Sequence, residues 1–333
     1  MAITLQEAKV GMRDHVDQNV IDEFRRSSLL LDKLTFDNSI SPGTGGSTLT
    51  YGYIQLQTPS TAAVRTINSE YAAGEAKRKE KTAKAITFGG SFKLDRVLQD
   101  TSGAIDELQF QLQQKIKATT NYFHNLVING IAAGSGSGQQ VANTFDGLSK
   151  ILASTETEIT SQIDISTSEL LDANANAFLD ELDGFIATLD GKPDMLLMND
   201  KMLLKLRSIA RRAGYYTRSE NSFGDFIEEY NGIALVDAGK YYNGSATKDV
   251  IETTAAGPGT EGKTDIYAVK FGLDAFHGIS PIGNKIVKTY LPDMAAPGAV
   301  KTGEVEMIAG VVLKNTKKAG VLRGIKIVPA TGE

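Results

Sequence analysis

The sequence contains no cysteine, so disulfides, thiolate metal sites and cysteine nucleophiles are all excluded. The absence of cysteine also fits a reducing compartment. Only three histidines are present, His15, His124 and His277, which leaves few ways to build a multi-histidine metal centre or a serine–histidine triad. This composition disfavours much of enzyme chemistry, and we expect no catalytic, cofactor-binding or metal-binding residues in the chain.

Long apolar runs are also missing. The longest purely aliphatic stretches, such as residues 195–198 (MLLM), are far shorter than the roughly 20 residues that span a bilayer. Residues 1–26 mix acidic, basic and apolar side chains and lack the apolar core of a signal peptide. We therefore expect a protein that is made and kept in a cytoplasm and that has no membrane partner.

Positive charge is in slight deficit, because 35 Lys and Arg against 40 Asp and Glu give a formal net charge of −5. A chain with this balance is not a dedicated nucleic-acid-binding protein, since polyanion binding needs a clear basic excess. With 333 residues, of which 41% are hydrophobic and 23% charged, the chain has the length for about two domains with a buried core.

The first forty-odd residues have the pattern of an arm. Apolar residues at helical spacing predict one amphipathic helix that ends before the breaker run SPGTGG at residues 41–46, and these residues are Val16, Val20, Ile21, Phe24 and Leu31. A single helix cannot make its own core. We expect this helix to lie on the rest of the chain or on a neighbouring copy.

Residues 47–98 are β-rich. Near-alternation predicts one strand from Leu49 to Leu56, closed by Pro59, and a second over residues 85–94, where Gly89-Gly90 indicates a bulge or kink. Between them, GEAKRKEKTAK at residues 74–84 is too polar to bury and predicts the charged tip of a long two-stranded flap. Such a ribbon is at best marginally stable alone. We expect its cations to contact an acidic neighbour, and these are Lys77, Arg78, Lys79, Lys81 and Lys84.

A long helix is predicted over residues 102–133, with Ser102 as its N-cap and Asp106 and Glu107 in its early turns. Its apolar stripe consists of Ile105, Leu108, Leu112, Ile116, Phe123, Leu126 and Val127. About thirty residues at 1.5 Å each give roughly 45 Å, which makes this helix a spine. It ends at the glycine–serine loop GSGSGQQ, residues 134–140.

The region from about residue 160 to 285 has an α/β pattern. Helices are predicted over residues 168–189 and 201–212, and strands over 194–198, 233–236 and 266–271. Three more strands are predicted near the C-terminus, at residues 286–291, 304–313 and 321–328. The second helix carries Lys201, Lys205, Arg207, Arg211 and Arg212. A solvated helix face is favoured over an inter-subunit or polyanion contact for these cations.

The segment from Gly257 to Thr264, GPGTEGKT, satisfies the phosphate-loop pattern GxxxxGK[ST]. A working phosphate loop needs a buried strand before it and a helix after it, because the helix N-terminus supplies the amide groups. Here the residues before it form a weak strand, and DIYAVKF after it has a strand-like pattern. We therefore predict a surface loop. Asp180, Glu181 and Asp183 are predicted to spread around a solvated helix face.

The order of these elements resembles that of the major capsid protein family of tailed bacteriophages (Hong Kong 97-type fold), a fold shared with encapsulin nanocompartments. The resemblance covers essentially the whole chain. It is carried by SEYAAGEAKRKEKTAKAITFGGSFKLDR (69–96), AIDELQFQLQQKIKATTNYFHNLVINGI (104–131), FDGLSKIL (145–152) and KPDMLLMNDKMLLKLRSI (192–209).

The resemblance implies an α+β fold with an N-terminal arm (1–46) and an extended β-loop (47–98). It further implies a peripheral domain with the spine helix (99–159 and 286–318) and an axial α/β domain (160–285 and 319–333). No long helical segment precedes the arm, so we expect a separate scaffolding protein. Some members join a loop lysine covalently to a neighbour's asparagine. No motif here identifies that asparagine, and this chemistry is not carried over.

The function implied is that of a structural protein. It would assemble into hexamers and pentamers in the host cell cytoplasm and form the icosahedral head shell of a virion. Its other partners would be a portal, a decoration protein and double-stranded DNA held by non-specific contact. Two alternatives are an encapsulin shell, which encloses cargo enzymes, and, from another class, a P-loop nucleotide-binding enzyme that uses Gly257–Thr264. A shell protein needs extensive self-complementary surface and no catalytic site.

Overall fold

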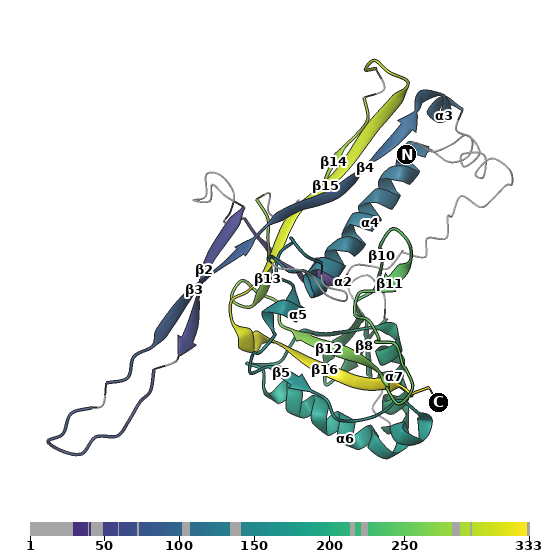
Figure 1. Cartoon of the computed structure of the whole chain (residues 1–333). Coiled ribbons are helices and arrows are strands. Elements are labelled where there is room, and N and C mark those ends of the chain that lie inside the picture. The colour runs from purple at the N-terminus through teal and green to yellow at the C-terminus, as the bar shows by residue number, and fades with distance from the viewer. Residues whose placement is uncertain are drawn as a thin grey trace.

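The chain forms two larger β-sheets covered by helices, and a two-stranded ribbon that leaves the body (Figure 1). The structure is a computed structural model, and it describes residues 29–38, 40, 49–58, 60–71, 73–101, 107–133, 141–213, 217–220, 226–281, 287–293 and 295–331. None of the helices in these ranges is long and apolar enough to cross a membrane.

The first sheet is organised around strand β15, which has fourteen residues. Its order is β1-β13-β15-β14, and β4 pairs with the other edge of β15. The strands are β1 (Phe36–Asp37), β4 (Ile86–Asp95), β13 (Phe276–Ile279), β14 (Val287–Tyr290) and β15 (Val300–Leu313). The first ten residues of β15 pair with β4, four of these also pair with β14, and the last four residues of β15 pair with β13. One long strand therefore holds together segments from most of the chain.

Helix α4 (Glu107–Asn129) lies along β4 and β15 (Figure 1). Its 23 described residues correspond to about 35 Å, and it ends four residues before the end predicted from the sequence, at about Ala133. It ends at Asn129, because the next residue, Gly130, bridges to Val141 and approaches the carbonyl oxygens of Leu126 and Phe145 too closely for any side chain. The predicted N-cap and the acidic residue at 106 lie outside the described residues.

The second sheet has the order β5-β16-β12-β6-β9-β8-β7. Its strands are β5 (Glu158–Thr160), β6 (Met195–Met198), β7 (Thr217–Glu220), β8 (Phe226–Tyr230), β9 (Ile233–Asp237), β12 (Gly262–Val269) and β16 (Ala319–Val328). The central strand β6 is buried at every position, since Leu197 faces the core beneath α4 while Leu196 and Met198 face the core beneath two other helices. Those helices are α6 (Ser168–Ala187) and α7 (Asp200–Ala213).

Smaller elements connect these layers. They are α2 (Leu29–Lys33), α3 (Arg96–Asp100), α5 (Leu148–Ile151), the hairpin β10 (Lys240–Tyr242) and β11 (Thr247–Asp249), and the 3₁₀ turn η2 (Thr316–Lys318). Arg323 of β16 ties three of the elements together. It forms ion pairs with Glu158 of β5 and with Asp265 of β12, and it donates a 2.9 Å hydrogen bond to the carbonyl oxygen of Ser149 in α5.

The ribbon differs from the predicted flap in its strand pairing. It consists of β2 (Thr50–Thr58) and β3 (Lys77–Lys84), which pair only with each other. The strand predicted at residues 85–94 is β4, and it pairs with β15. The charged segment is thus a strand of the ribbon and not its tip. The sequence concealed this because most side chains of β3 are exposed, so no apolar alternation marks the strand.

The bulge predicted at Gly89-Gly90 is also absent, since the register between β4 and β15 is continuous through these residues. Gly89 is instead required by close packing, because a Cβ atom there would collide with the carbonyl oxygen of Val305.

The other predicted elements are confirmed. The helices at 168–189 and 201–212 are α6 and α7, and the strands at 194–198, 233–236 and 266–271 are β6, β9 and β12. The three late strands are β14, β15 and β16. Of the predicted arm helix, α2 is described, whereas Val16 to Phe24 and the breaker run at 41–46 lie outside the described residues.

Substitution of Phe123 tests whether the core lies beneath α4. Phe123 is fully buried on α4, and its ring centroid is 6.0 Å from that of Phe88, 6.2 Å from that of Phe145 and 6.3 Å from that of Phe36. We expect Phe123→Ala to lower the free energy of unfolding by about 3–5 kcal/mol, measured by urea denaturation. Leu273→Ala, at a position 52% exposed, is the control and should change it little. An unchanged unfolding midpoint for Phe123→Ala would contradict this placement of the core.

Candidate self-association surface

The ribbon is rooted in the body through Tyr51. This side chain is buried in a small core with Ile40, Ala85, Ile279 and Val312, and its hydroxyl donates a 3.1 Å hydrogen bond to the carboxylate of Asp37. Beyond the root the ribbon projects away from both sheets (Figure 1). The residues between β2 and β3 extend it further, so a large part of this segment has no core of its own.

Strand β3 carries the five cations that the sequence analysis singled out. Residues 77–84 hold five cations and one carboxylate, a net charge of 5 − 1 = +4. Because side chains alternate along a strand, Arg78 and Lys84 lie on one face of the ribbon, and Lys77, Lys79 and Lys81 lie on the other. Desolvation, and then the charge of Lys79, lower the pKa of Lys81. Within the described residues none of the five forms an ion pair, so their charge is left for another partner.

The tip of the ribbon is an ordered turn that exposes apolar side chains. The amide of Ser69 donates to the carbonyl oxygen of Thr66 at 3.2 Å, and Asn68 has a φ of 68°, as in a type II turn. The guanidinium of Arg65 lies 5.3 Å from the ring centroid of Tyr71. Three apolar side chains here are largely in solvent: Val64 is 100% exposed, Ile67 91% and Tyr71 63%. Apolar groups held on a projecting turn indicate a surface that another molecule covers.

A second exposed apolar set lies at the opposite end of the molecule, at the outer ends of β4, β14 and β15 (Figure 1). It consists of Val97, Tyr290, Leu291 and Val300, each between 47% and 62% exposed. The described part of the chain thus exposes two separate apolar sets, one on the ribbon and one at the far end of the first sheet.

Several basic side chains of helix α7 already contact other groups of the same chain. Lys205 donates to the carbonyl oxygens of Ile165 and Ser166 at 2.9 and 2.6 Å. Arg207 forms a 2.7 Å ion pair with Glu228, and Arg212 forms one of 2.5 Å with Asp172. Helix α7 therefore presents fewer unpaired cations to another molecule than the ribbon does.

The predicted acidic cluster on α6 does not form a site. Glu181 accepts a hydrogen bond from Ser161 at 2.6 Å, while Asp183 accepts from the hydroxyl of Tyr230 at 2.8 Å. Asp180 is exposed. The three carboxylates thus have separate surroundings, as the sequence analysis predicted.

The phosphate-loop pattern lies in a surface turn. Gly257 and Thr260 form a two-residue bridge, and strand β12 begins at Gly262. Lys263 is exposed on this strand, whereas the hydroxyl of Thr264 is buried and accepts a 2.9 Å hydrogen bond from Asn199. The segment that follows the pattern is a strand and not the helix that a phosphate loop requires. The prediction of a surface loop is confirmed for residues 257–261, whereas residues 262–264 belong to β12, with Gly262 and Thr264 buried.

The described histidines lie on separate elements. His124 is on α4, where burial lowers its pKa to about 4. His277 is fully buried on β13, and its ring meets that of Tyr51 edge to face, with centroids 6.0 Å apart. Neither ring nitrogen of His277 has a hydrogen-bond partner in the described structure. No group of three or more histidine, aspartate or glutamate side chains in the described ranges is placed to hold a metal ion. His15 lies outside those ranges.

The surroundings of His277 keep it neutral at pH 7. Burial and then the positive charge of Lys314 lower its pKa, and the backbone of Ala275 and the carboxylates of Asp37 and Asp274 act in the opposite direction with smaller effect. This ring therefore sits uncharged beneath the root of the ribbon.

Sequence reasoning found the cations of the ribbon but missed its apolar tip. The signal was present, because Val64, Ile67 and Tyr71 are isolated apolar residues in a polar stretch outside any predicted strand or helix. Such residues are ordinary in loops, so the sequence alone could not show that these side chains are largely exposed to solvent.

Neither a protein-family model nor a curated protein matches the sequence. Solved structures do. An encapsulin chain from the holo-SrpI complex of Synechococcus elongatus superposes with a TM-score of 0.64 at 12% identity, over 100% of this chain and 99% of that one. A capsid chain of Myoviridae phage XM1 gives 0.56 at 13% identity, over 98% and 99%. A chain of Mycobacterium phage Ogopogo gives 0.55 at 15% identity, over 96% and 99%.

These comparisons establish the fold. The chain has the α+β fold shared by tailed-phage capsid proteins and encapsulins, over essentially its whole length, and the fold class predicted from the sequence is confirmed.

The neutral His277 predicts how stability depends on pH. Because its pKa in the folded protein is below the usual value of about 6.5, the unfolded chain binds more protons as the pH falls below 6.5. The stabilisation is therefore complete above pH 6.5 and is lost progressively toward the pKa of the folded state. We expect the free energy of unfolding, measured in urea, to fall between pH 7.5 and pH 5.

In His277→Leu this decrease should be smaller. His124 acts in the same direction and accounts for part of what remains, so His124→Leu serves as the comparison. A His277→Leu variant with the full pH dependence of the unmodified protein would show that the ring does not titrate as this site requires.

Proposed function

We propose that this chain is a structural, shell-forming protein whose copies associate through the projecting ribbon. The observation that carries the proposal is the ribbon itself, with a basic strand that forms no ion pair within the described residues and an apolar tip exposed to solvent. The fold it shares with capsid and encapsulin chains supports the same reading.

The ribbon lacks a packed core of its own beyond its root. Two strands without a packed face are at best marginally stable in water, so a partner surface would stabilise β2 and β3. Cations along β3 would select an acidic partner and guide its approach. Head-to-tail contacts, in which a ribbon meets a different surface of the next copy, close into rings when the rotation between copies permits it.

More specifically, we propose that the shell is the head of a tailed phage. Rings of six and five copies would form a closed icosahedral shell around double-stranded DNA, with a scaffolding protein, a portal and a decoration protein as further partners. The arm, the extended loop, the peripheral domain and the axial domain would take the residue ranges that the sequence analysis gives them, except that β4 and β13, which pair with β15, would belong to the peripheral domain. The protein would then be a component of the virion, and we propose no catalytic role for it.

An encapsulin shell is the alternative, and the superposition on an encapsulin chain favours it. The two differ in what the particle encloses. Nuclease-resistant DNA inside purified particles would support the head shell, and a co-purifying cargo protein without DNA would support the encapsulin. The P-loop enzyme has no comparable support, because a strand follows Gly257–Thr264.

The charge of β3 tests the proposal. We expect the combined replacement of Lys77, Arg78, Lys79 and Lys81 by Glu to leave the circular dichroism spectrum unchanged and to prevent shell formation, observed by size-exclusion chromatography and electron microscopy. Each exposed ion pair contributes only about 0–1 kcal/mol, but the contact repeats at every subunit interface. Lys79→Ala alone should give shells that dissociate at lower salt than the unmodified protein.

Lys263→Glu is the matched control, since Lys263 is an exposed lysine on another sheet. It should assemble normally. Normal shells from the fourfold charge reversal would remove the electrostatic role of the ribbon.

A further inference from the structure

Among the described residues, no strand pairs with the outer edge of β2. This strand has nine residues, and its partner in that part of the chain is β3, in a sheet of two strands. An unpaired strand edge offers a row of backbone donors and acceptors to which an extended segment of another chain can add. The side-chain amide of Gln55 on β2 donates to the carbonyl oxygen of Lys314 at 3.2 Å.

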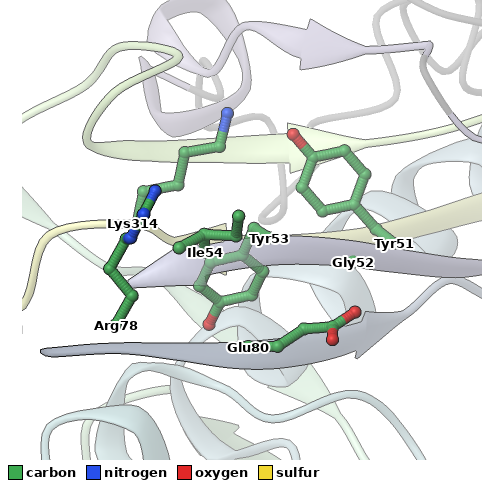
Figure 2. Close-up of a pocket in the computed structure, with 7 residues that line it drawn as sticks. All are labelled: Tyr51, Gly52, Tyr53, Ile54, Arg78, Glu80 and Lys314. Carbon is green, nitrogen blue, oxygen red and sulfur yellow. The ribbon is translucent and has the colours of Figure 1, made fainter. Parts of the chain in front are cut away.

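A pocket of about 740 Å³ lies along this part of the strand (Figure 2). Its lining residues are Tyr51, Gly52, Tyr53 and Ile54 of β2, Arg78 and Glu80 of β3, and Lys314. Ile54 pairs with Glu80, and with Gly52 and Arg78 it lies on one face of the ribbon, whereas Tyr51 lies on the other face, next to Lys314. The pocket therefore reaches from one face of the ribbon around β2 to Lys314. Figure 2 shows Lys314 on the side of β2 opposite the strand that carries Glu80.

The chemistry of the pocket selects an acidic ligand. The ammonium group of Lys314 lies 5.6 Å from the ring centroid of Tyr51, and in the described structure neither Lys314 nor Arg78 forms an ion pair. Glu80 is the single carboxylate of the lining, which leaves a net charge of 2 − 1 = +1. Ile54, 64% exposed, offers an apolar surface beside these charges.

We infer that this pocket is a docking site for an extended acidic segment of another protein, which adds to β2 as a third strand. Its backbone would pair with the open edge, one carboxylate would lie between Lys314 and Arg78, and an alternating apolar side chain would rest on Ile54. The inference goes beyond shell formation and does not depend on it, since a chain that remains a monomer presents the same edge.

The probe is a seven-residue, fluorescein-labelled peptide of alternating Asp and Val, and its control carries Lys in place of each Asp. We expect saturable binding of the acidic peptide by fluorescence anisotropy, at least about ten-fold tighter than that of the basic peptide. Methylation of alternate backbone nitrogens of the peptide should weaken binding, because it removes the donors that strand addition uses.

Two variants test the pocket itself. A Cβ atom at Gly52 would meet only the Glu80 carboxylate, at 3.6 Å, so the side chain of Gly52→Val fits without distortion and occupies the pocket. We expect Gly52→Val to weaken binding about ten-fold with an unchanged circular dichroism spectrum. Lys314→Glu should reverse the preference between the acidic and basic peptides, while the control Lys263→Glu should bind as the unmodified protein does.

Equal binding of the two peptides, or unchanged binding by Gly52→Val and Lys314→Glu, would overturn the inference. Binding by dissociated subunits but not by assembled particles would also overturn it, because a second copy would then fill the edge. Failure of the shell proposal has a different signature, since a protein that never assembles can still bind the acidic peptide.

Discussion

Strand β15 is the element on which the rest of the molecule depends. It pairs with β4 over ten residues on one edge, and with β14 and then β13 on the other. Through β4 it holds the root of the ribbon, and through the turn η2 it continues into β16 of the second sheet. The fourteen residues of β15 therefore set the position of the ribbon relative to both cores, and the side chains of its second half are buried almost without interruption.

The body is stabilised by its own packed cores, whereas most of the ribbon is not. In the body, both faces of the second sheet are covered and Arg323 joins three elements through ion pairs and a hydrogen bond. In the ribbon, burial ends near Tyr51, and beyond it the described segment has exposed cations and exposed apolar side chains. The ribbon thus holds exposed apolar and charged side chains away from the packed body. Another chain can reach them there.

Sequence reasoning predicted the parts of the fold that follow from apolar pattern. Strand β6, helices α6 and α7 and the late strands have strong patterns, and all were located. The second ribbon strand was missed because Lys77 to Lys84 has no buried face, and the helix end at Gly130 depends on a close approach to Phe145 that no local pattern records. The pocket could not be predicted from the sequence either, because Lys314 lies 259 residues along the chain from Gln55, with which it shares a hydrogen bond.

Shell formation is tested most directly by negative-stain electron microscopy of the purified, full-length protein. The account predicts closed particles of uniform diameter, because head-to-tail contacts close copies into rings and further contacts between rings close the shell. Size-exclusion chromatography of the same sample should place the protein far above its monomer mass of 35.7 kDa. Monomers alone, at concentrations and salt conditions where the ribbon charges are unscreened, would contradict the account.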